Sequence, residues 1–200
     1  MPCGAYRQAL GDTMIRGLML AAVASNFLSV AHAAALDGVS LPDTQWSNGK
    51  SLLLNGIGLR TYSVFSIHIY VAGLYLEHLN DNANAIIESP ESKLLEIRFV
   101  HDISANEARD AWQDGFEQNC KLPCYLDPHA VQQFLAAVPS IEKGDEAKLL
   151  FTSSGVELRT NGRLMGRIAD PHFADIILST FIGPVPPTPR LKRELLGNRN

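Results

Sequence analysis

The chain has 200 residues, of which 46% are apolar and 19% are charged, and these proportions exclude an intrinsically disordered protein. Its formal net charge of −4 comes with no cluster of lysine and arginine, so the sequence does not support nucleic-acid binding. The length suits one domain of ordinary size.

The first 33 residues have the pattern of a secretory signal peptide. Arg16 precedes an apolar run over residues 17–30, and an A-x-A pattern follows at residues 31–33. The run is shorter than the ~20 apolar residues that span a bilayer. We therefore expect cleavage near Ala33, export to the periplasm or beyond, and no stable membrane anchor afterwards. Residues 34–200 form the mature domain, and Met14 is an alternative start.

The first part of the mature chain has the pattern of β-strands. Residues 36–48 predict a strand and a turn, and residues 51–58 and 59–66 predict two more strands. Residues 66–76 are rich in β-branched and aromatic side chains and give the strongest strand signal. Tyr70 and Leu74 share one face of this segment, and Val71 and Tyr75 share the other. Both faces are largely apolar, so we expect both to be covered.

Helices dominate the middle of the chain. A short helix over residues 82–88 and a strand over 93–100 precede a helix that starts with a capping box, Ser104 with Glu107. One stripe of this helix carries Ala108, Ala111, Trp112, Gly115, Phe116 and Asn119. Asp127 and Pro128 then begin a second helix that runs to about residue 138.

The last part of the chain alternates strands and helices. Residues 147–152, 156–160 and 163–169 predict strands, and Asn161-Gly162 predicts a hairpin turn. Asp170-Pro171 begins a helix to residue 181, and Thr188-Pro189 begins a short terminal helix. This order differs from a regular βαβ alternation. It predicts an α+β fold, an antiparallel β-sheet with helices packed on one face.

Two cysteines remain after removal of the signal segment, which contains Cys3. Cys120 and Cys124 are separated by three residues, not by the two residues of redox catalysts. With no nearby histidine, two thiols are too few for a zinc site. We expect a structural disulfide in an oxidising compartment, with two buried free thiols as the alternative.

Several apparent motifs lack the context that their chemistry needs. Residues 55–58 (NGIG) resemble part of a dinucleotide fingerprint, but the third glycine and the following helix are missing. The histidines at 68, 78, 101, 129 and 172 have no metal-ligand spacing, and no G-x-S-x-G elbow is present. We therefore predict no cofactor and no metal.

Three stretches together resemble the chalcone isomerase-like family, in its exported bacterial form. Residues 55–60 (NGIGLR) and 69–77 (IYVAGLYLE) resemble its G-x-R strand and the strand that follows. Residues 97–99 (IRF), with the helix that ends at residues 117–120 (EQNC), are similar to its next strand and helix. The hairpin at residues 161–162 and the helix to residue 183 follow the family order. The resemblance covers most of the mature chain.

The resemblance implies an open-faced β-sandwich, with a ligand cleft between the sheet and the helices. Chalcone isomerases cyclise a chalcone to a flavanone by attack of a phenolate on an enone, which needs a cation near the phenolate and donors near the ketone. Arg60 and Asn119 stand where the family keeps an arginine and an asparagine. Tyr70, Trp112 and Ala174 replace a threonine, a tyrosine and a serine or threonine of the plant enzymes.

These replacements favour a binding protein over an enzyme. Arg60 beside an apolar wall suits a fatty-acid carboxylate, as in non-catalytic relatives, with Tyr70, Trp112 and Asn119 completing the ligand site. The alternative is an intramolecular lyase acting on a phenolic ligand, with Arg60, Tyr70 and Asn119 as catalytic residues. A second alternative is a non-catalytic envelope protein that contacts a partner.

A purely structural role is the competing interpretation for each of these residues. Arg60 would then form an ion pair within the sheet. Tyr70 and Trp112 would be packing aromatics. Asn119 would bond to its own helical turn.

Overall fold

A computed structural model describes residues 33–62 and 66–198, so the predicted signal segment lies outside the described residues except for Ala33. The strands are β1 Ala33–Leu36, β2 Val39–Pro42, β3 Thr44–Ser47, β4 Lys50–Tyr62, β5 Ile67–Leu76, β6 Lys93–Phe99, β7 Glu146–Thr152, β8 Gly155–Thr160 and β9 Arg163–Ile168. The helices are α1 Ala83–Glu88, α2 Ala105–Asn119, α3 Pro128–Ala136, α4 Pro171–Ile182 and α5 Pro189–Leu195. Among these residues, the structure contains no helix with the length and apolar character needed to cross a membrane.

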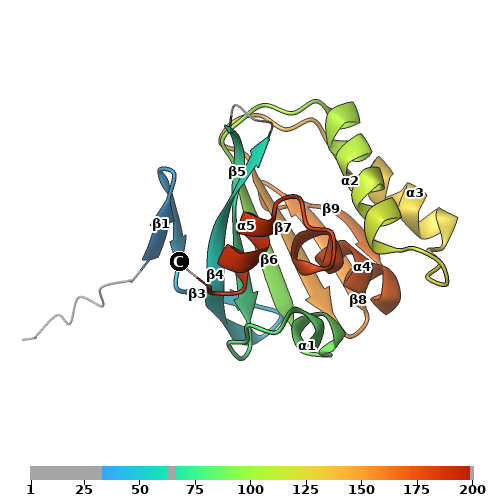
Figure 1. Cartoon of the computed structure of the whole chain (residues 1–200), viewed down its shortest axis with the longest axis horizontal. Coiled ribbons are helices and arrows are strands. Elements are labelled where there is room, and N and C mark those ends of the chain that lie inside the picture. Colours follow the sequence, from blue (N-terminus) through green and yellow to red (C-terminus); the bar gives the residue numbers. More distant parts are fainter. Residues whose placement is uncertain (1–32, 63–65, 199–200) are drawn as a thin grey trace, which may run out of the picture. The chain divides into compact units, whose positions relative to one another are not determined.

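Strands β3 to β9 form one antiparallel sheet in which each strand pairs with its neighbours in the chain (Figure 1). The helices pack on one face of this sheet, which confirms the predicted α+β class. The Asn161-Gly162 turn between β8 and β9 has positive φ at both residues, as its sequence predicts. The predicted separation of residues 51–58 from 59–66 is wrong. Residues 51–62 lie in one strand, β4, because the shifts of register after Leu54 and Arg60 alter its pairing with β5 without ending the strand.

Both faces of β5 are covered, as its two apolar faces predict. Ala72 and Leu74 lie in the main core beneath the helices. On the opposite face, Val71 packs with Leu41 of the separate β1–β2 hairpin. Burial on both sides therefore explains why this strand lacks the alternation of a half-exposed one.

The helical layer is held by caps and by close packing. The predicted capping box of α2 is confirmed, since Ser104 Oγ accepts from Glu107 N at 3.2 Å and Glu107 Oε2 accepts from Ser104 N at 2.9 Å. At Gly115, α2 lies so close to α4 that an added Cβ would stand 3.1 Å from Thr180 Cγ2. These contacts fix α2 against the buried helix α4.

Helix α5 lies against β4 along the NGIG run. A Cβ added at Gly56 would clash with the backbone carbonyls of Glu194 and Leu195. Asn55 Nδ2 donates to Leu195 O at 2.9 Å, and Leu59 N donates to Glu194 Oε2 at 3.0 Å. The two glycines of this run therefore permit helix docking, which gives them a role without any phosphate ligand.

Candidate functional site

Arg60 follows the NGIG run in β4, and it lies on the face of the sheet that the helices cover. Its side chain is half-buried, and Nη1 donates to Thr61 O at 2.8 Å and to Pro187 O at 2.7 Å. Pro187 belongs to residues 183–188, which join α4 to α5 and which we call the α4–α5 linker. The guanidinium therefore ties the sheet to the α4–α5 linker.

Arg60 forms no ion pair with a carboxylate in the described part of the chain. Four other arginines do: Arg98, Arg159, Arg167 and Arg190 each contact a glutamate. A purely structural Arg60 is expected to form an ion pair within the sheet. Backbone carbonyls accept its hydrogen bonds instead. Carbonyl dipoles satisfy hydrogen bonds but leave the unit positive charge without a counter-charge, and such a half-buried guanidinium attracts anions.

Tyr70 is the cross-strand partner of Arg60. Its ring lies 5.7 Å from the ring of Phe99 and 6.5 Å from that of Phe181, measured between centroids. Burial raises the pKa of Tyr70 well above its ordinary value of 10.0, and the nearby Arg60 charge lowers it only in part. The phenol therefore stays protonated at neutral pH and is a hydrogen-bond donor beside the guanidinium.

Trp112 lies in an aromatic cluster between the helices. Its ring centroid is 4.9 Å from Phe134, 5.6 Å from Phe181 and 5.8 Å from Phe116. Ala174, the other replaced position, is 2% exposed within the same core. This packing is what the helical stripe of α2 predicts for Trp112.

Asn119 uses its amide on backbone groups. Nδ2 donates to Gly115 O at 2.9 Å, within its own helix, and to Val185 O at 3.0 Å, while Oδ1 accepts from Val185 N at 3.2 Å. Val185 also belongs to the α4–α5 linker. Arg60 and Asn119 therefore both hydrogen-bond to this linker.

The structure thus brings the four predicted site residues around Phe181 and the α4–α5 linker that follows it. Tyr70 and Trp112 both contact the Phe181 ring, and Arg60 and Asn119 both bond the linker. Together these groups offer one cation, one protonated phenol and an aromatic surface. Such a set can hold an anion with an apolar body once the α4–α5 linker moves away from these side chains.

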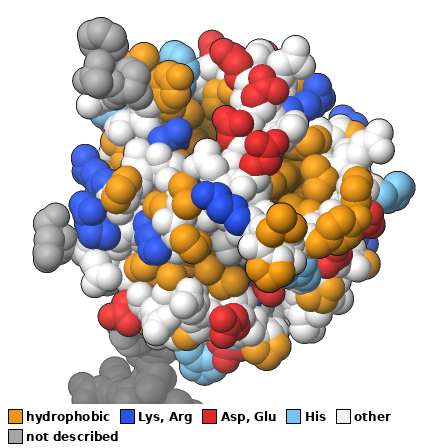
Figure 2. All heavy atoms as spheres, turned by 45° about the vertical axis from the view of Figure 1, so that its right-hand side comes forward, with side chains coloured by type: hydrophobic (Ala, Val, Ile, Leu, Met, Phe, Trp, Pro, Cys, Tyr) orange, Lys and Arg blue, Asp and Glu red, His pale blue; other side chains and the backbone are white. Residues whose placement is uncertain are grey.

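A groove lies elsewhere, between α2 and α3. This groove of about 860 Å³ has a mainly apolar lining, which includes Phe116, Leu126, Val131 and Leu135. Figure 2 shows hydrophobic side chains gathered around a hollow on the side of the molecule that carries these helices. Arg60 and Tyr70 do not line this groove.

Arg109, which the sequence reasoning did not single out, lines the α2–α3 groove. Its Nε donates to Leu135 O at 3.0 Å and its Nη2 to Val138 O at 3.0 Å, at the end of α3. Like Arg60, it contacts no carboxylate among the described residues. No local signal marks it, because an arginine in a helix is most often solvated.

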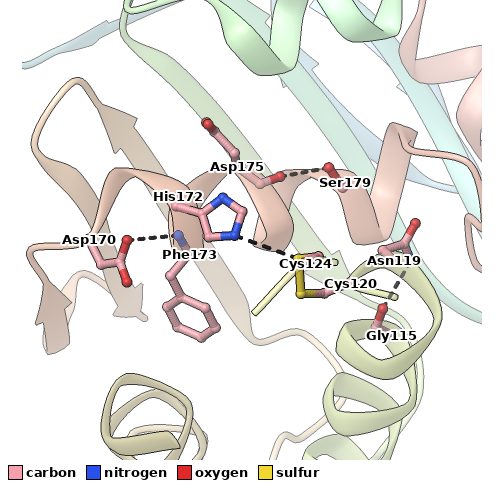
Figure 3. The surroundings of a disulfide bond; sticks show 9 residues. All are labelled: Gly115, Asn119, Cys120, Cys124, Asp170, His172, Phe173, Asp175 and Ser179. Carbon is pink, nitrogen blue, oxygen red and sulfur yellow. Dashed lines mark hydrogen bonds between the residues drawn. A yellow bond between two sulfur atoms is a disulfide. The ribbon is translucent and has the colours of Figure 1, made fainter. Parts of the chain in front are cut away.

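Cys120 and Cys124 are joined in a disulfide next to His172 (Figure 3). His172 Nε2 lies 3.6 Å from Cys124 Sγ. The prediction that no histidine lies near the cysteines is therefore wrong. The histidine is 48 residues from Cys124 in the chain, and it lies close because α4 packs against α2.

Comparison with known proteins gives one family and one fold. The sequence model of a family described as chalcone isomerase-like matches residues 33–197. The crystal structure of a fatty-acid binding protein from Arabidopsis thaliana superposes with a TM-score of 0.70 at 17% identity, covering 84% of this chain and 97% of that one. No curated protein matches the sequence. At this identity the structural likeness shows the fold alone.

Proposed function

This chain belongs to the chalcone isomerase-like family, and from this premise we propose that it binds a small amphipathic carboxylate, such as a fatty acid, at Arg60. The observation that carries the proposal is the half-buried Arg60 guanidinium, which has no carboxylate partner among the described residues and lies beside Tyr70. The fatty-acid binding protein from Arabidopsis thaliana, which has the same fold, supports the same ligand class.

Binding exchanges one set of contacts for another. The ligand carboxylate takes over from Pro187 O as acceptor for Arg60, and the charged, bidentate contact is stronger than the carbonyl contact it replaces. Tyr70 donates a further hydrogen bond. The acyl chain lies against the Phe99 and Phe181 rings, where each buried methylene contributes about 0.8 kcal/mol.

The proposal includes export of the protein through residues 1–33. The charge, apolar run and A-x-A pattern of this segment support it. The Cys120–Cys124 disulfide also supports it, because such bonds persist in oxidising compartments.

The test is calorimetry with decanoate, below its micelle-forming concentration, together with mass spectrometry of lipids extracted from the purified protein. Arg60→Ala should weaken binding about 10- to 100-fold, the range of a lost charged hydrogen bond. Arg163→Ala, which removes an exposed arginine, is the matched control and should bind like the wild type.

Two results would contradict the proposal in different ways. Absence of bound lipid, together with no heat of binding for the wild type, rejects the ligand class. Loss of binding in Arg109→Ala but not in Arg60→Ala rejects the Arg60 site and moves the ligand to the α2–α3 groove.

The geometry gives less support to the lyase alternative. Arg60 and Tyr70 are available for the lyase reaction. The Asn119 amide, however, is hydrogen-bonded to Gly115 and Val185, and Trp112 is packed among aromatic rings. Chalcone absorbance, followed with the wild type and with Arg60→Ala, separates the two functions. A rate no faster than buffer rejects the lyase.

A further inference from the structure

We propose that Cys120, Cys124 and His172 form a binding site for a thiophilic divalent cation such as Zn²⁺ once the Cys120–Cys124 disulfide is reduced. The site is independent of Arg60 and of the proposed carboxylate function. Its three ligand atoms are two sulfurs and an imidazole nitrogen, and all of them lie within 4.8 Å of one another. Thiolate and imidazole are the ligands that structural and catalytic zinc sites use.

The distance between the histidine and one cysteine already suits a shared metal. With Zn–S near 2.3 Å and Zn–N near 2.0–2.1 Å, a tetrahedral zinc places its sulfur and nitrogen ligands about 3.6 Å apart. The observed separation of Cys124 Sγ and His172 Nε2 is 3.6 Å. The two sulfurs must separate to about 3.8 Å by the same geometry.

The ligands come from elements that the rest of the fold holds in place. Cys120 caps α2, with its N–H donating to Phe116 O at 2.8 Å, and Cys124 N donates to Lys121 O at 2.9 Å. His172 stands in the first turn of α4, which packs against α2. Figure 3 shows its imidazole directed at the disulfide. Reduction therefore frees two thiols beside a histidine that is already positioned.

The redox step has a defined balance. A dithiol reductant supplies two electrons and two protons, the S–S bond breaks, each cysteine sulfur becomes a thiol, and the reductant closes its own disulfide. Metal binding then releases the two thiol protons. With three protein ligands the fourth position is open to water, since His172 is exposed. Oxidation and metal binding are thus mutually exclusive.

The experiment titrates the full chain with Co²⁺ as a spectroscopic probe, before and after reduction by a dithiol that is then removed under inert gas. All variants carry Cys3→Ser, so that the third cysteine contributes nothing. The reduced protein should develop a thiolate-to-cobalt charge-transfer band that saturates at one equivalent and that Zn²⁺ abolishes. The oxidised protein should show no such band.

Two histidine variants test the third ligand. His172→Ala should weaken Co²⁺ binding at least about tenfold, a loss that even an outer-shell partner can cause. His129→Ala, which removes an exposed histidine on α3, should leave affinity and spectrum unchanged. Unchanged binding in His172→Ala overturns the three-ligand site, as does a reduced protein without the band. A reduced chain that loses its native circular dichroism in the presence of Co²⁺ also overturns it, because the site needs α2 and α4 packed together.

Discussion

Arg60 and Tyr70 face each other across β4 and β5, on the side of the sheet that the helices cover. The guanidinium favours the ionised phenol and burial disfavours it, and burial is the larger effect. The pair therefore presents a fixed cation and a neutral donor at the margin of an aromatic cluster. This arrangement suits recognition of an anion better than proton abstraction by a tyrosinate.

Arg60→Ala should lower the free energy of unfolding by about 1.5–3 kcal/mol without any ligand, because its charged hydrogen bond to Pro187 O is lost. Decanoate at about 100 times Kd should stabilise the wild type by about 2.7 kcal/mol and the variant much less. Urea unfolding with and without decanoate measures both effects. Equal stabilisation of the two proteins would show that the ligand does not contact Arg60.

Tyr70→Phe should reduce the loss of stability at alkaline pH. The folded-state pKa of Tyr70 lies above the unfolded value of 10.0, so its contribution to stability is full below pH 10 and falls as the pH rises towards the folded pKa. Urea unfolding between pH 8 and about pH 11 should show a shallower decline in the variant. Tyr125→Phe, at an exposed tyrosine, is the matched control, and an identical decline in all three proteins would contradict the prediction.

Asn119→Asp should destabilise the protein more than Asn119→Ala. Alanine cannot form the hydrogen bonds to Val185, so the backbone N–H and C=O of Val185 are left to water. The free energy of unfolding should fall by about 1–3 kcal/mol. Aspartate in addition places a carboxylate against the carbonyl oxygens of Gly115 and Val185. Denaturant unfolding of both variants checks the order. Wild-type stability in Asn119→Ala would mean that the amide does not hold the α4–α5 linker.

Gly56→Ala should cost about 1–3 kcal/mol through overpacking, because its methyl group meets the carbonyls of Glu194 and Leu195. Helix α5 must then move away from β4. Hydrogen exchange should increase in α5 more than in α2. Ser51→Ala, at an exposed position of the same strand, is the control, and a similar exchange pattern in both variants would refute the close contact.

Arg98→Met should destabilise the protein more than the double variant Glu96→Met/Arg98→Met. The Glu96 carboxylate is fully buried and relies on Arg98, Gln45 and Lys148. Removal of one partner of such a buried pair costs about 3–5 kcal/mol, and replacement of both with apolar groups often restores stability. Because Arg98 is 37% exposed, we expect the lower part of this range. A double variant less stable than Arg98→Met would contradict the explanation.

Local sequence patterns are enough to predict the elements that depend on near neighbours. The capping box of Ser104 and Glu107, the Asn161-Gly162 turn and the two-faced pattern of β5 each arise within a few residues, and the structure has them all. The order of these elements, with the motifs at residues 55–60 and 69–77, was enough for the α+β class and the family.

The partners of the polar side chains depend instead on the packing of the whole fold. Arg60 bonds Pro187 across 127 residues, Asn119 bonds Val185 across 66, and His172 reaches Cys124 across 48. No local pattern encodes these contacts, because each results from how the helices pack on the sheet. The periodicity of a segment sets which face is apolar, but the neighbours of a guanidinium or an imidazole depend on every element that the fold brings to it.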